Sequence, residues 1–563
     1  MVPKILLQEL AMKGKKLNIW TTSSFFIFLT YLIFLVYPII IVLKQALIHE
    51  GQFSLANFED FFSKSYYSET LVNSFNVSIT STVTSLVLGT LLAYLFSIYD
   101  FKGKKFLQIL IIIASMSAPF VGAYSWILLL GRNGVITKFL TNALHLPAID
   151  IYGFKGIVLV FTLQLFPLVF LYVAGAMKRI DHSLLEAAES MGVFGFKRMI
   201  TVILPLLVPT LLAAALLVFM RAFSDFGTPM LIGEGYRTFP VLIYNQFISE
   251  VGGNSAFASA LAIMAIIIAL TIFLIQKYIS NRYSFSMNSL HPIEPKKTTK
   301  GKMAAIYATV YGIVLFSVLP QLFLIYTSFL KTSGMVFVKG YSLNSYKIAF
   351  NRMGATIFNT IRIPLIALIL VVLFASFISY LAVRKRNLFT NLIDSLSMVP
   401  YIVPGTVLGI AFISSFNTGI FGSGFLMITG TAFILIISLS VRRLPYTIRS
   451  SVASLQQIAP SIEEAAESLG SSRLNTFSNI TVPMMLPGII SGSILSWVTM
   501  ISELSTSILL YNAKTKTMTV AIYTEVLRGN YGVAAALSTI LTVLTVASLL
   551  LFMKISKNNS ITL

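Results

Sequence analysis

One short polar stretch occurs twice in this chain, and both copies are followed by the same pattern of apolar residues and prolines. The first copy begins at Ser183 and reads S-L-L-E-A-A-E-S-M-G; the second begins at Ser461, 278 residues later, and reads S-I-E-E-A-A-E-S-L-G. The same offset relates three pairs of prolines around the copies: Pro167 and Pro445, Pro205 and Pro483, and Pro209 and Pro487. A repeat that keeps its register over this length predicts a chain of two similar halves.

Each copy is expected to form a short helix. Ser183 with Glu186, and Ser461 with Glu464, fit the S-x-x-E capping box, in which each side chain accepts a backbone N–H at the start of a helix. The alternative is that each copy is an ordinary connection between two membrane helices. Duplication at a fixed spacing favours helices with a shared task, because a plain connection need not be the same twice.

Glycine and alanine complete the pattern. Gly192 and Gly470 should end the two helices, because glycine enters the left-handed conformation at low cost. Small side chains keep one side of each helix thin, namely Ala187, Ala188, Ala465 and Ala466. We therefore expect two thin helices outside the bilayer that fit sockets on a partner protein.

The rest of the chain is too apolar for a soluble protein. It has 563 residues, of which 56% are hydrophobic and only 11% are charged, as is typical of a protein that crosses a membrane many times. We predict an all-α integral membrane protein with about twelve spans, arranged as two parallel six-helix repeats. The apolar runs of the first half cover 20–43, 71–99, 106–130, 156–177, 202–223 and 256–279. Those of the second half cover 303–329, 356–383, 388–413, 425–444, 480–501 and 534–553.

A polar segment separates the two predicted halves. Residues 281–302 include H-P-I-E-P-K-K-T-T-K-G-K and show no apolar periodicity, which is typical of a linker. We expect one half at 1–280, a cytoplasmic linker at 281–302 that acts as a tether, and a second half at 303–563. Because each half has an even number of spans, a pseudo-twofold axis along the membrane normal should relate them.

The basic residues predict the orientation of the chain. The formal net charge is +21, but Lys and Arg gather on segments that alternate with the predicted spans, which argues against a nucleic-acid partner. By the positive-inside rule, both termini and both polar copies lie in the cytoplasm, and anionic lipid headgroups of the bilayer are the expected partner of this charge. The basic residues include Lys4, Lys13, Lys15, Lys16, Lys178, Arg179, Lys197, Arg198, Arg442, Arg443, Arg449, Arg473, Lys554 and Lys557.

Several chemistries are excluded by the sequence. The chain has no cysteine, so it has neither disulfides nor thiolate metal sites. It lacks the G-x-x-x-x-G-K-[ST] pattern, so it does not bind ATP through a P-loop. No catalytic triad, metal-ligand cluster or dinucleotide fingerprint is recognisable. We expect a protein that is not an enzyme, binds no cofactor itself and receives its energy from elsewhere.

The duplicated stretch resembles the EAA loop of binding-protein-dependent ABC importer permeases. The family pattern is E-A-A, three residues, Gly, nine residues and I-x-L-P. Both copies fit, with Val202 in place of Ile in the first and Val482 in place of Leu in the second. The resemblance implies a type I importer permease fold with both halves fused, in a bacterial inner membrane.

The same resemblance implies the partners and the coupling residues. Each EAA loop, at 181–200 and 459–478, should dock on one of two cytoplasmic ABC ATPase subunits that use ATP and Mg. A substrate-binding protein should deliver the cargo on the outer face. The implied coupling residues are Glu186, Ala187, Ala188, Gly192, Glu464, Ala465, Ala466 and Gly470.

An acidic residue follows the fifth span of each half. Asp225 and Glu503 are again 278 residues apart. Carboxylates at a membrane end are costly unless they face a cavity or a partner, so they are candidate oxygen ligands for a cation in transit; the alternative is that they fix helix ends. Arg221 and Arg362 lie in or near apolar spans and either meet an anionic substrate or extend to the interface.

The segments around these acids resemble fused permeases of ferric iron importers, and ferric iron is therefore the expected substrate. Related permeases serve phosphonates, hexose phosphates, thiamine and polyamines, which remain alternatives. From another class of protein, a self-sufficient secondary transporter can also have six plus six spans, and a channel or structural membrane protein would need no ATPase. Neither would require two capped helices at equivalent positions.

Overall fold

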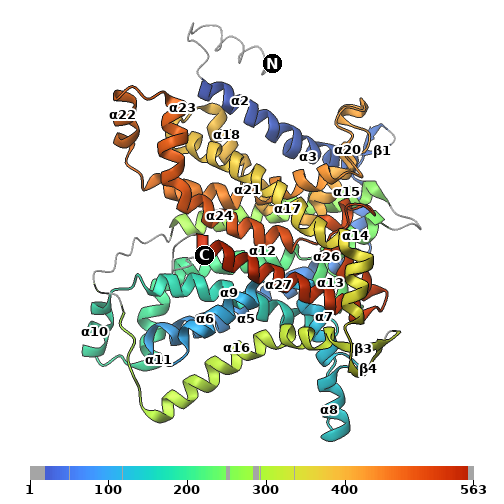
Figure 1. The fold of residues 1–563 in the computed structure, drawn as a ribbon, viewed down its shortest axis with the longest axis vertical. Helices are drawn as coiled ribbons and strands as arrows, with labels where there is room; N and C mark the ends of the chain where they lie inside the picture. Colours follow the sequence, from blue (N-terminus) through green and yellow to red (C-terminus); the bar gives the residue numbers. More distant parts are fainter. Residues whose placement is uncertain are drawn as a thin grey trace. The chain divides into compact units, whose positions relative to one another are not determined.

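The computed structural model describes residues 19–49, 51–116, 118–248, 254–282, 291, 293–334 and 336–555, and the described chain is predominantly helical (Figure 1). The basic residues expected at the N-terminus and Lys557 lie outside these residues. The all-α prediction is confirmed, since the described strands form only two small antiparallel hairpins. These are β1 (Ile48–His49) with β2 (Gln52–Phe53), and β3 (Leu330–Ser333) with β4 (Val336–Tyr341).

The first half supplies sixteen of the described elements of Figure 1 besides its hairpin. Its helices are α2 (Ile19–Tyr31), η1 (Leu32–Val36), α3 (Tyr37–Leu47), α4 (Ala56–Ser63), α5 (Ser65–Ile98), α6 (Lys104–Met116), α7 (Pro119–Leu130), α8 (Val135–Ala143), α9 (Phe154–Met177), α10 (His182–Ser190), α11 (Gly195–Arg198), η2 (Met199–Ile203), α12 (Leu204–Ser224), α13 (Gly227–Ile232), α14 (Phe239–Ile248) and α15 (Ser255–Arg282).

The second half repeats much of this order. Its helices are α16 (Lys300–Ser328), α17 (Asn344–Arg384), α18 (Leu388–Leu396), α19 (Val399–Ile402), α20 (Gly405–Phe416), η3 (Ile420–Gly422), α21 (Ala432–Gln456), α22 (Pro460–Ser468), α23 (Arg473–Thr476), η4 (Phe477–Thr481), α24 (Val482–Ile501), α25 (Ser507–Leu510), α26 (Met518–Leu527) and α27 (Tyr531–Ile555). The parallels include α10 with α22, α12 with α24, and α14 with α26.

Ten helices among the described residues are long and apolar enough to cross a membrane, and a pair bent by 101°, Lys104–Ser115 with Phe120–Ala143, makes an eleventh candidate. The predicted span at 425–444 has other bounds: α21 begins at Ala432 and is not among these candidates. Glycines with positive φ, including Gly424 and Gly430, precede it and delay its start, while Arg442, Arg443 and Arg449 make it less apolar. The predicted span at 388–413 is divided into α18, α19 and α20, and Pro404 stands immediately before α20.

A single turn of π-helix precedes the duplicated prolines in each half. The N–H of Leu204 bonds to the carbonyl of Met199, and the N–H of Val482 bonds to that of Phe477. Proline has no N–H to continue the usual ladder, and a wider turn just before Pro205 and Pro483 changes the partners of the freed carbonyls. The two halves therefore share a local irregularity as well as a sequence pattern.

The chain forms two compact units, whose bounds do not coincide with those of the predicted halves. One contains residues 1–40, 365–401 and 439–497, and the other contains 41–364, 402–438 and 498–563. In the first unit, α2 packs on α18, and Trp20 is buried against Tyr380 and Phe477, with ring centroids 4.8 and 5.7 Å away. In the second unit, α16 packs on α6 and α7. The first span of each half thus packs on the third span of the other half.

Candidate docking helices and substrate pathway

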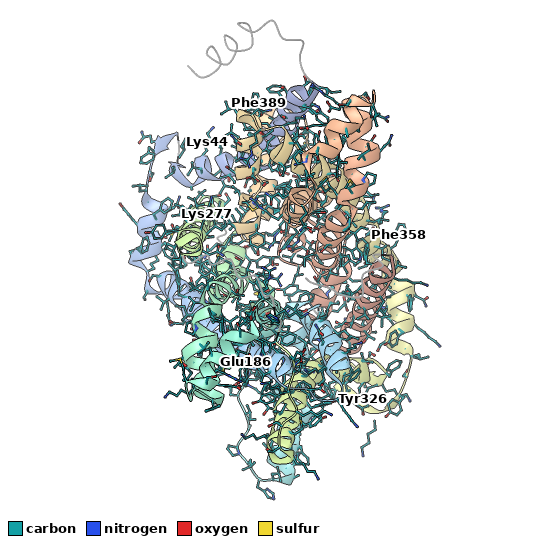
Figure 2. The ribbon with its side chains drawn as sticks, turned by 90° about the vertical axis from the view of Figure 1, so that its left-hand side faces the viewer. Lys44, Glu186, Lys277, Tyr326, Phe358 and Phe389 are labelled. Carbon is teal, nitrogen blue, oxygen red and sulfur yellow. The ribbon has the colours of Figure 1, made fainter. Side chains whose placement is uncertain are left out.

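Helix α10 carries the first EAA sequence, and its start differs from the predicted capping box. The N-cap is Asp181, whose Oδ1 accepts the N–H of Ser183 at 3.0 Å. Ser183 already lies inside the helix, so the predicted Ser183–Glu186 box is wrong. An aspartate carboxylate is a strong N-cap acceptor. Asp181 therefore starts the helix two residues earlier in the sequence than the predicted cap at Ser183. Glu186 is exposed (Figure 2) and lies 3.4 Å from His182 Nε2.

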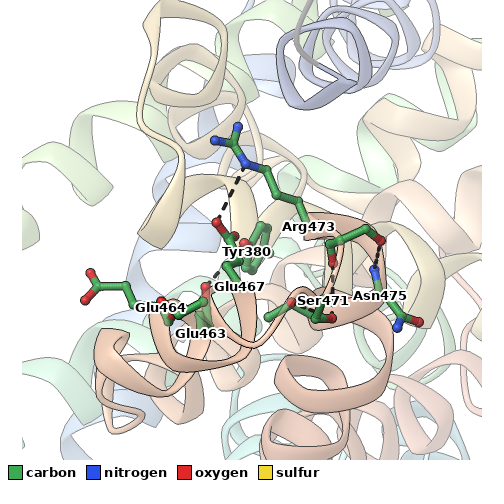
Figure 3. A network of polar contacts seen from close by, with 10 residues as sticks. Tyr380, Glu463, Glu464, Glu467, Ser471, Arg473 and Asn475 are labelled. Carbon is green, nitrogen blue, oxygen red and sulfur yellow. Dashed lines mark hydrogen bonds and ion pairs between the residues drawn. The ribbon is translucent and has the colours of Figure 1, made fainter.

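Helix α22 carries the second EAA sequence, and its start also differs from the prediction. Its N-cap is Ala459, which offers no side-chain bond, and Pro460 occupies the first turn. Proline suits this position because the N–H it lacks would have no helical partner there. The predicted Ser461–Glu464 box is therefore wrong as well. The Glu464 side chain points away from Tyr380 and Glu467 (Figure 3).

Both helices end as the glycines predict. Gly192 and Gly470 have φ of 77° and 91°. The residue after each glycine donates its N–H back to a buried alanine: Val193 to Ala188 at 2.9 Å, and Ser471 to Ala466 at 3.0 Å. With the bonds from each glycine N–H to Glu189 and Glu467, this is a Schellman motif. Ala188 and Ala466 face inward, whereas Glu186, Ala187, Glu464 and Ala465 are exposed.

A large apolar side chain projects from the end of each helix. Met191 is 81% exposed and Leu469 is 91% exposed, and the two are 278 residues apart. Leu184 and Ile462, a second equivalent pair, are also exposed. Contiguous exposed apolar patches mark sites of protein contact, whereas single exposed apolar residues are common; here the same two positions are exposed in both copies. The sequence analysis missed these residues, although the apolar residue before each glycine was a visible signal.

A buried ion pair anchors α22 to α17. Arg384 Nε lies 3.0 Å from Glu463 Oε1, with only 12% and 10% of the two side chains exposed. Tyr380 donates its hydroxyl to Glu463 Oε2 at 3.3 Å, and Arg384 also donates to the carbonyl of Ile458 at 2.6 Å. Glu467 and Arg473 form a more exposed ion pair nearby (Figure 3).

The first half holds the equivalent helix, α10, with different charges. At the position equivalent to Glu463 it has Leu185, which is buried. Its ion pair is instead formed by Glu189 at the end of α10 and Arg198 of α11. Sequence analysis did not single out Glu463; the departure from leucine inside an otherwise matching repeat was the available signal.

The two acidic residues predicted for the substrate pathway both accept backbone N–H groups at or just before helix starts. Asp225 Oδ1 accepts the N–H of Thr228 at 2.8 Å, and Glu503 Oε1 accepts the N–H of Thr506 at 3.0 Å. Their segments meet, since a Cβ added at Gly227 would lie 3.1 Å from Leu504 Cδ2. Within the described residues, no group of three or more His, Cys, Asp or Glu could hold a metal ion.

The two candidate arginines lie in different surroundings. Arg221 is half-buried in the last turn of α12. Arg362 is exposed on α17 and stacks over the ring of Phe358, 5.5 Å from its centroid. Figure 2 labels Phe358 on this helix. Stacking on a neighbour in its own helix agrees with the interfacial interpretation of Arg362.

A helical membrane protein with two equivalent exposed helices and two acidic segments that meet has features expected of a subunit of a membrane transporter. The chain belongs to the family described as binding-protein-dependent transport system inner membrane component, whose model matches residues 6–285 and 372–558. It is thus an integral membrane protein and a permease subunit of an ABC importer, with the family domain present twice.

Relatives agree with this family. The chain is 30% identical over 553 residues to the ferric transport system permease protein FbpB of Actinobacillus pleuropneumoniae, covering 96% of this chain and 78% of the relative. It is 29% identical over 517 residues to the putative ferric transport system permease protein FbpB 1 of Haemophilus influenzae, covering 90% and 80%. A putative 2-aminoethylphosphonate transport system permease protein PhnU of Salmonella typhi is 24% identical over 251 residues, covering 44% and 86%.

Proposed function

We propose that this permease imports ferric iron and that α10 and α22 each dock on one cytoplasmic ATPase subunit. The observation that carries the docking role is the duplicated exposed helix that ends in an apolar side chain and a glycine turn. ATP and Mg are used by the partner subunits, and this chain binds no cofactor. Family membership in an ATP-driven class leaves no support for a self-sufficient secondary transporter.

The proposed orientation places both termini, α10 and α22 in the cytoplasm. Basic residues flank both helices, including Lys178 and Lys197 near α10 and Arg449 and Arg473 near α22, and such residues favour the cytoplasmic side. A binding protein then delivers substrate to the opposite face. ATP-driven closure of the ATPases shifts both docking helices and biases the permease between inward-facing and outward-facing states.

Replacing Met191 or Leu469 by glutamate is expected to weaken ATPase binding about tenfold for each change, which corresponds to about 1.4 kcal/mol. A charge at the centre of an apolar contact loses its hydration without gaining a partner. Affinity between the purified permease and its ATPase measures the effect. The exchanges Met191→Leu and Leu469→Met keep the side chains apolar and serve as controls. If both glutamate variants bind the ATPase with unchanged affinity, the proposed docking role of α10 and α22 is contradicted.

Ferric iron is supported by the two ferric transport relatives and by the meeting carboxylate segments. Asp225 and Glu503 supply hard oxygen atoms of the kind that suits such a cation. A pair of carboxylates is a weaker ligand set than a closed site, so it allows release. A phosphonate or another organic anion is the second candidate, favoured by the similarity to the phosphonate relative, and it would shift attention to Arg221 and Arg362.

The double variant Asp225→Asn with Glu503→Gln tests the ligand role. Both amides keep an oxygen that can accept the N–H groups of Thr228 and Thr506, so the helix starts are preserved while the charge is lost. We expect iron uptake by proteoliposomes to fall about tenfold, the equivalent of about 1.4 kcal/mol, while binding-protein docking and basal ATP hydrolysis persist. Near-normal uptake would show that the two residues only fix helix ends. If the wild-type protein takes up a phosphonate but not iron, the assignment of ferric iron as the substrate is wrong.

A further inference from the structure

The described part of the linker is bonded to the start of the first docking helix. The backbone N–H of His182 donates to the carbonyl of His291 at 2.8 Å. The N–H of His291 donates in turn to Asp181 Oδ2 at 3.2 Å, while Oδ1 of the same carboxylate caps α10. One side chain therefore holds both the helix start and the linker.

The linker has a second attachment five residues further on. The N–H of Lys296 donates to the carbonyl of Ile98 at 2.8 Å, and the N–H of Asp100 donates to the carbonyl of Lys296 at 3.1 Å. Tyr99 and Lys296 form a parallel bridge. Ile98 is the last residue of α5. Through their backbone bonds, His291 and Lys296 thus link the start of α10 to the end of the second span, which a slack tether would not do.

In the second half, a side chain makes the equivalent connection. Arg384 ends α17 and bonds to Glu463 of α22 and to the carbonyl of Ile458 just before it. The residue equivalent to Arg384 in the first half is Ile98, at the offset of 286 that also relates Tyr94 to Tyr380. The side chain of isoleucine cannot donate a hydrogen bond to a carbonyl or a carboxylate, as that of arginine does. At the place where the second half has an arginine, the first half bonds to the linker.

We propose that His291 and residues 293–296 form a brace that positions α10 for its ATPase and replaces, in the first half, the link that Arg384 makes in the second. The brace rests on the proposed docking role of α10 and adds a positioning element to it. Asp181 is the positioning residue at one end and the backbone of Lys296 holds the other. The fusion segment is therefore part of the coupling machinery and carries more than the covalent connection.

Proline substitutions remove the two brace bonds that the linker donates, while its carbonyls can still accept the N–H groups of His182 and Asp100. The pair His291→Pro and Lys296→Pro deletes both donor N–H groups, whereas His291→Ala and Lys296→Ala remove the same side chains but keep the donors. The chain has no cysteine, so a single introduced thiol reports on one place. Ser190 and Ser468 are exposed and occupy equivalent positions in the two copies. The changes Ser190→Cys and Ser468→Cys therefore place the thiol at the end of α10 or of α22.

The measurement is cross-linking from each thiol to the ATPase in the full complex, together with iron transported per ATP hydrolysed. One net hydrogen bond shifts an equilibrium about fivefold. We expect the proline pair to lower the yield from Ser190→Cys at least about fivefold, to leave the yield from Ser468→Cys unchanged and to lower transport per ATP. The alanine pair should match the parent. Equal yields from both thiols in all variants, or equal losses with proline and alanine, would overturn the brace.

If the variant with both prolines does not insert into the membrane, two variants with exchanged linker segments still test the proposal in the full chain. Residues 283–290 are exchanged for the same number of Gly and Ser residues in one variant, and residues 291–299 in the other. Only the second should lower the Ser190→Cys yield; loss in both or in neither would contradict the brace. If the Met191→Glu and Leu469→Glu variants also bind the ATPase normally, the docking role itself fails, whereas a failure confined to the linker variants rejects the brace alone.

Discussion

Replacing Arg384 by methionine is expected to weaken ATPase binding at α22 by more than about 100-fold. The change keeps much of the side-chain volume but leaves Glu463, whose side chain is only 10% exposed, without its cationic partner. Removing one member of a buried pair costs about 3–5 kcal/mol, and about 1.4 kcal/mol corresponds to a factor of ten. Cross-linking from Ser468→Cys and thermal unfolding of the purified permease measure the effect.

The control for this change comes from the other half of the chain. The double variant Arg384→Met with Glu463→Leu copies the apolar residue found at Leu185 and leaves no buried charge behind. Replacing both members of a buried pair by apolar groups is often close to neutral, so this variant should recover to within about tenfold of the parent. A single variant that binds as tightly as the parent, or a double variant no better than the single, would show that the ion pair does not hold α22.

Valine at both Gly192 and Gly470 is expected to weaken ATPase binding by more than about 100-fold, and each single change by about tenfold. The two glycines have φ of 77° and 91°, and a Cβ at either position would meet no other atom within 4 Å. The cost is therefore backbone strain, which is about 1–2 kcal/mol or more for a β-branched residue in this region. The turn should shift, and the exposed Met191 and Leu469 should lose their positions.

Asparagine provides the matched control at the same two sites, because it tolerates the left-handed region far better than valine does. Substrate-stimulated ATP hydrolysis and affinity for the ATPase are the measurements, with membrane insertion checked in parallel. Valine variants that insert and couple normally, or asparagine variants as impaired as the valine ones, would contradict a role for the turn geometry.

The parts of the fold that could be predicted from the sequence are those with local causes. Apolar runs long enough to span a bilayer, glycine at a helix end, and a repeat in register all report on nearby residues. The capping boxes were mistaken because two local signals competed: Asp181 and Pro460 lie just before the serines and start the helices earlier. The division into spans was least accurate where proline and glycine interrupt apolar runs, as at Pro404 and Gly430.

The parts of the candidate site that could not be predicted depend on residues distant in the sequence. Arg384 and Glu463 meet only because the fold brings α17 and α22 together. The departure of Glu463 from Leu185 marks the position in the repeat but does not identify its partner. The linker looks like a tether because its composition is polar and aperiodic, yet backbone bonds at His291 and Lys296 require no particular side chain. Such bonds leave no trace in composition, so only the three-dimensional arrangement shows them.

The exchange of first spans between halves has a consequence for how the protein is made. Helix α2 is synthesised first, but its neighbour α18 follows more than 350 residues later in the chain. Contacts this distant in sequence form slowly, since a long loop must close before they contribute. Trp20 therefore cannot be buried against Tyr380 and Phe477 until both residues have been synthesised. Neither half can reach its final packing alone, and one continuous chain supplies the two halves in equal numbers at the same time and place.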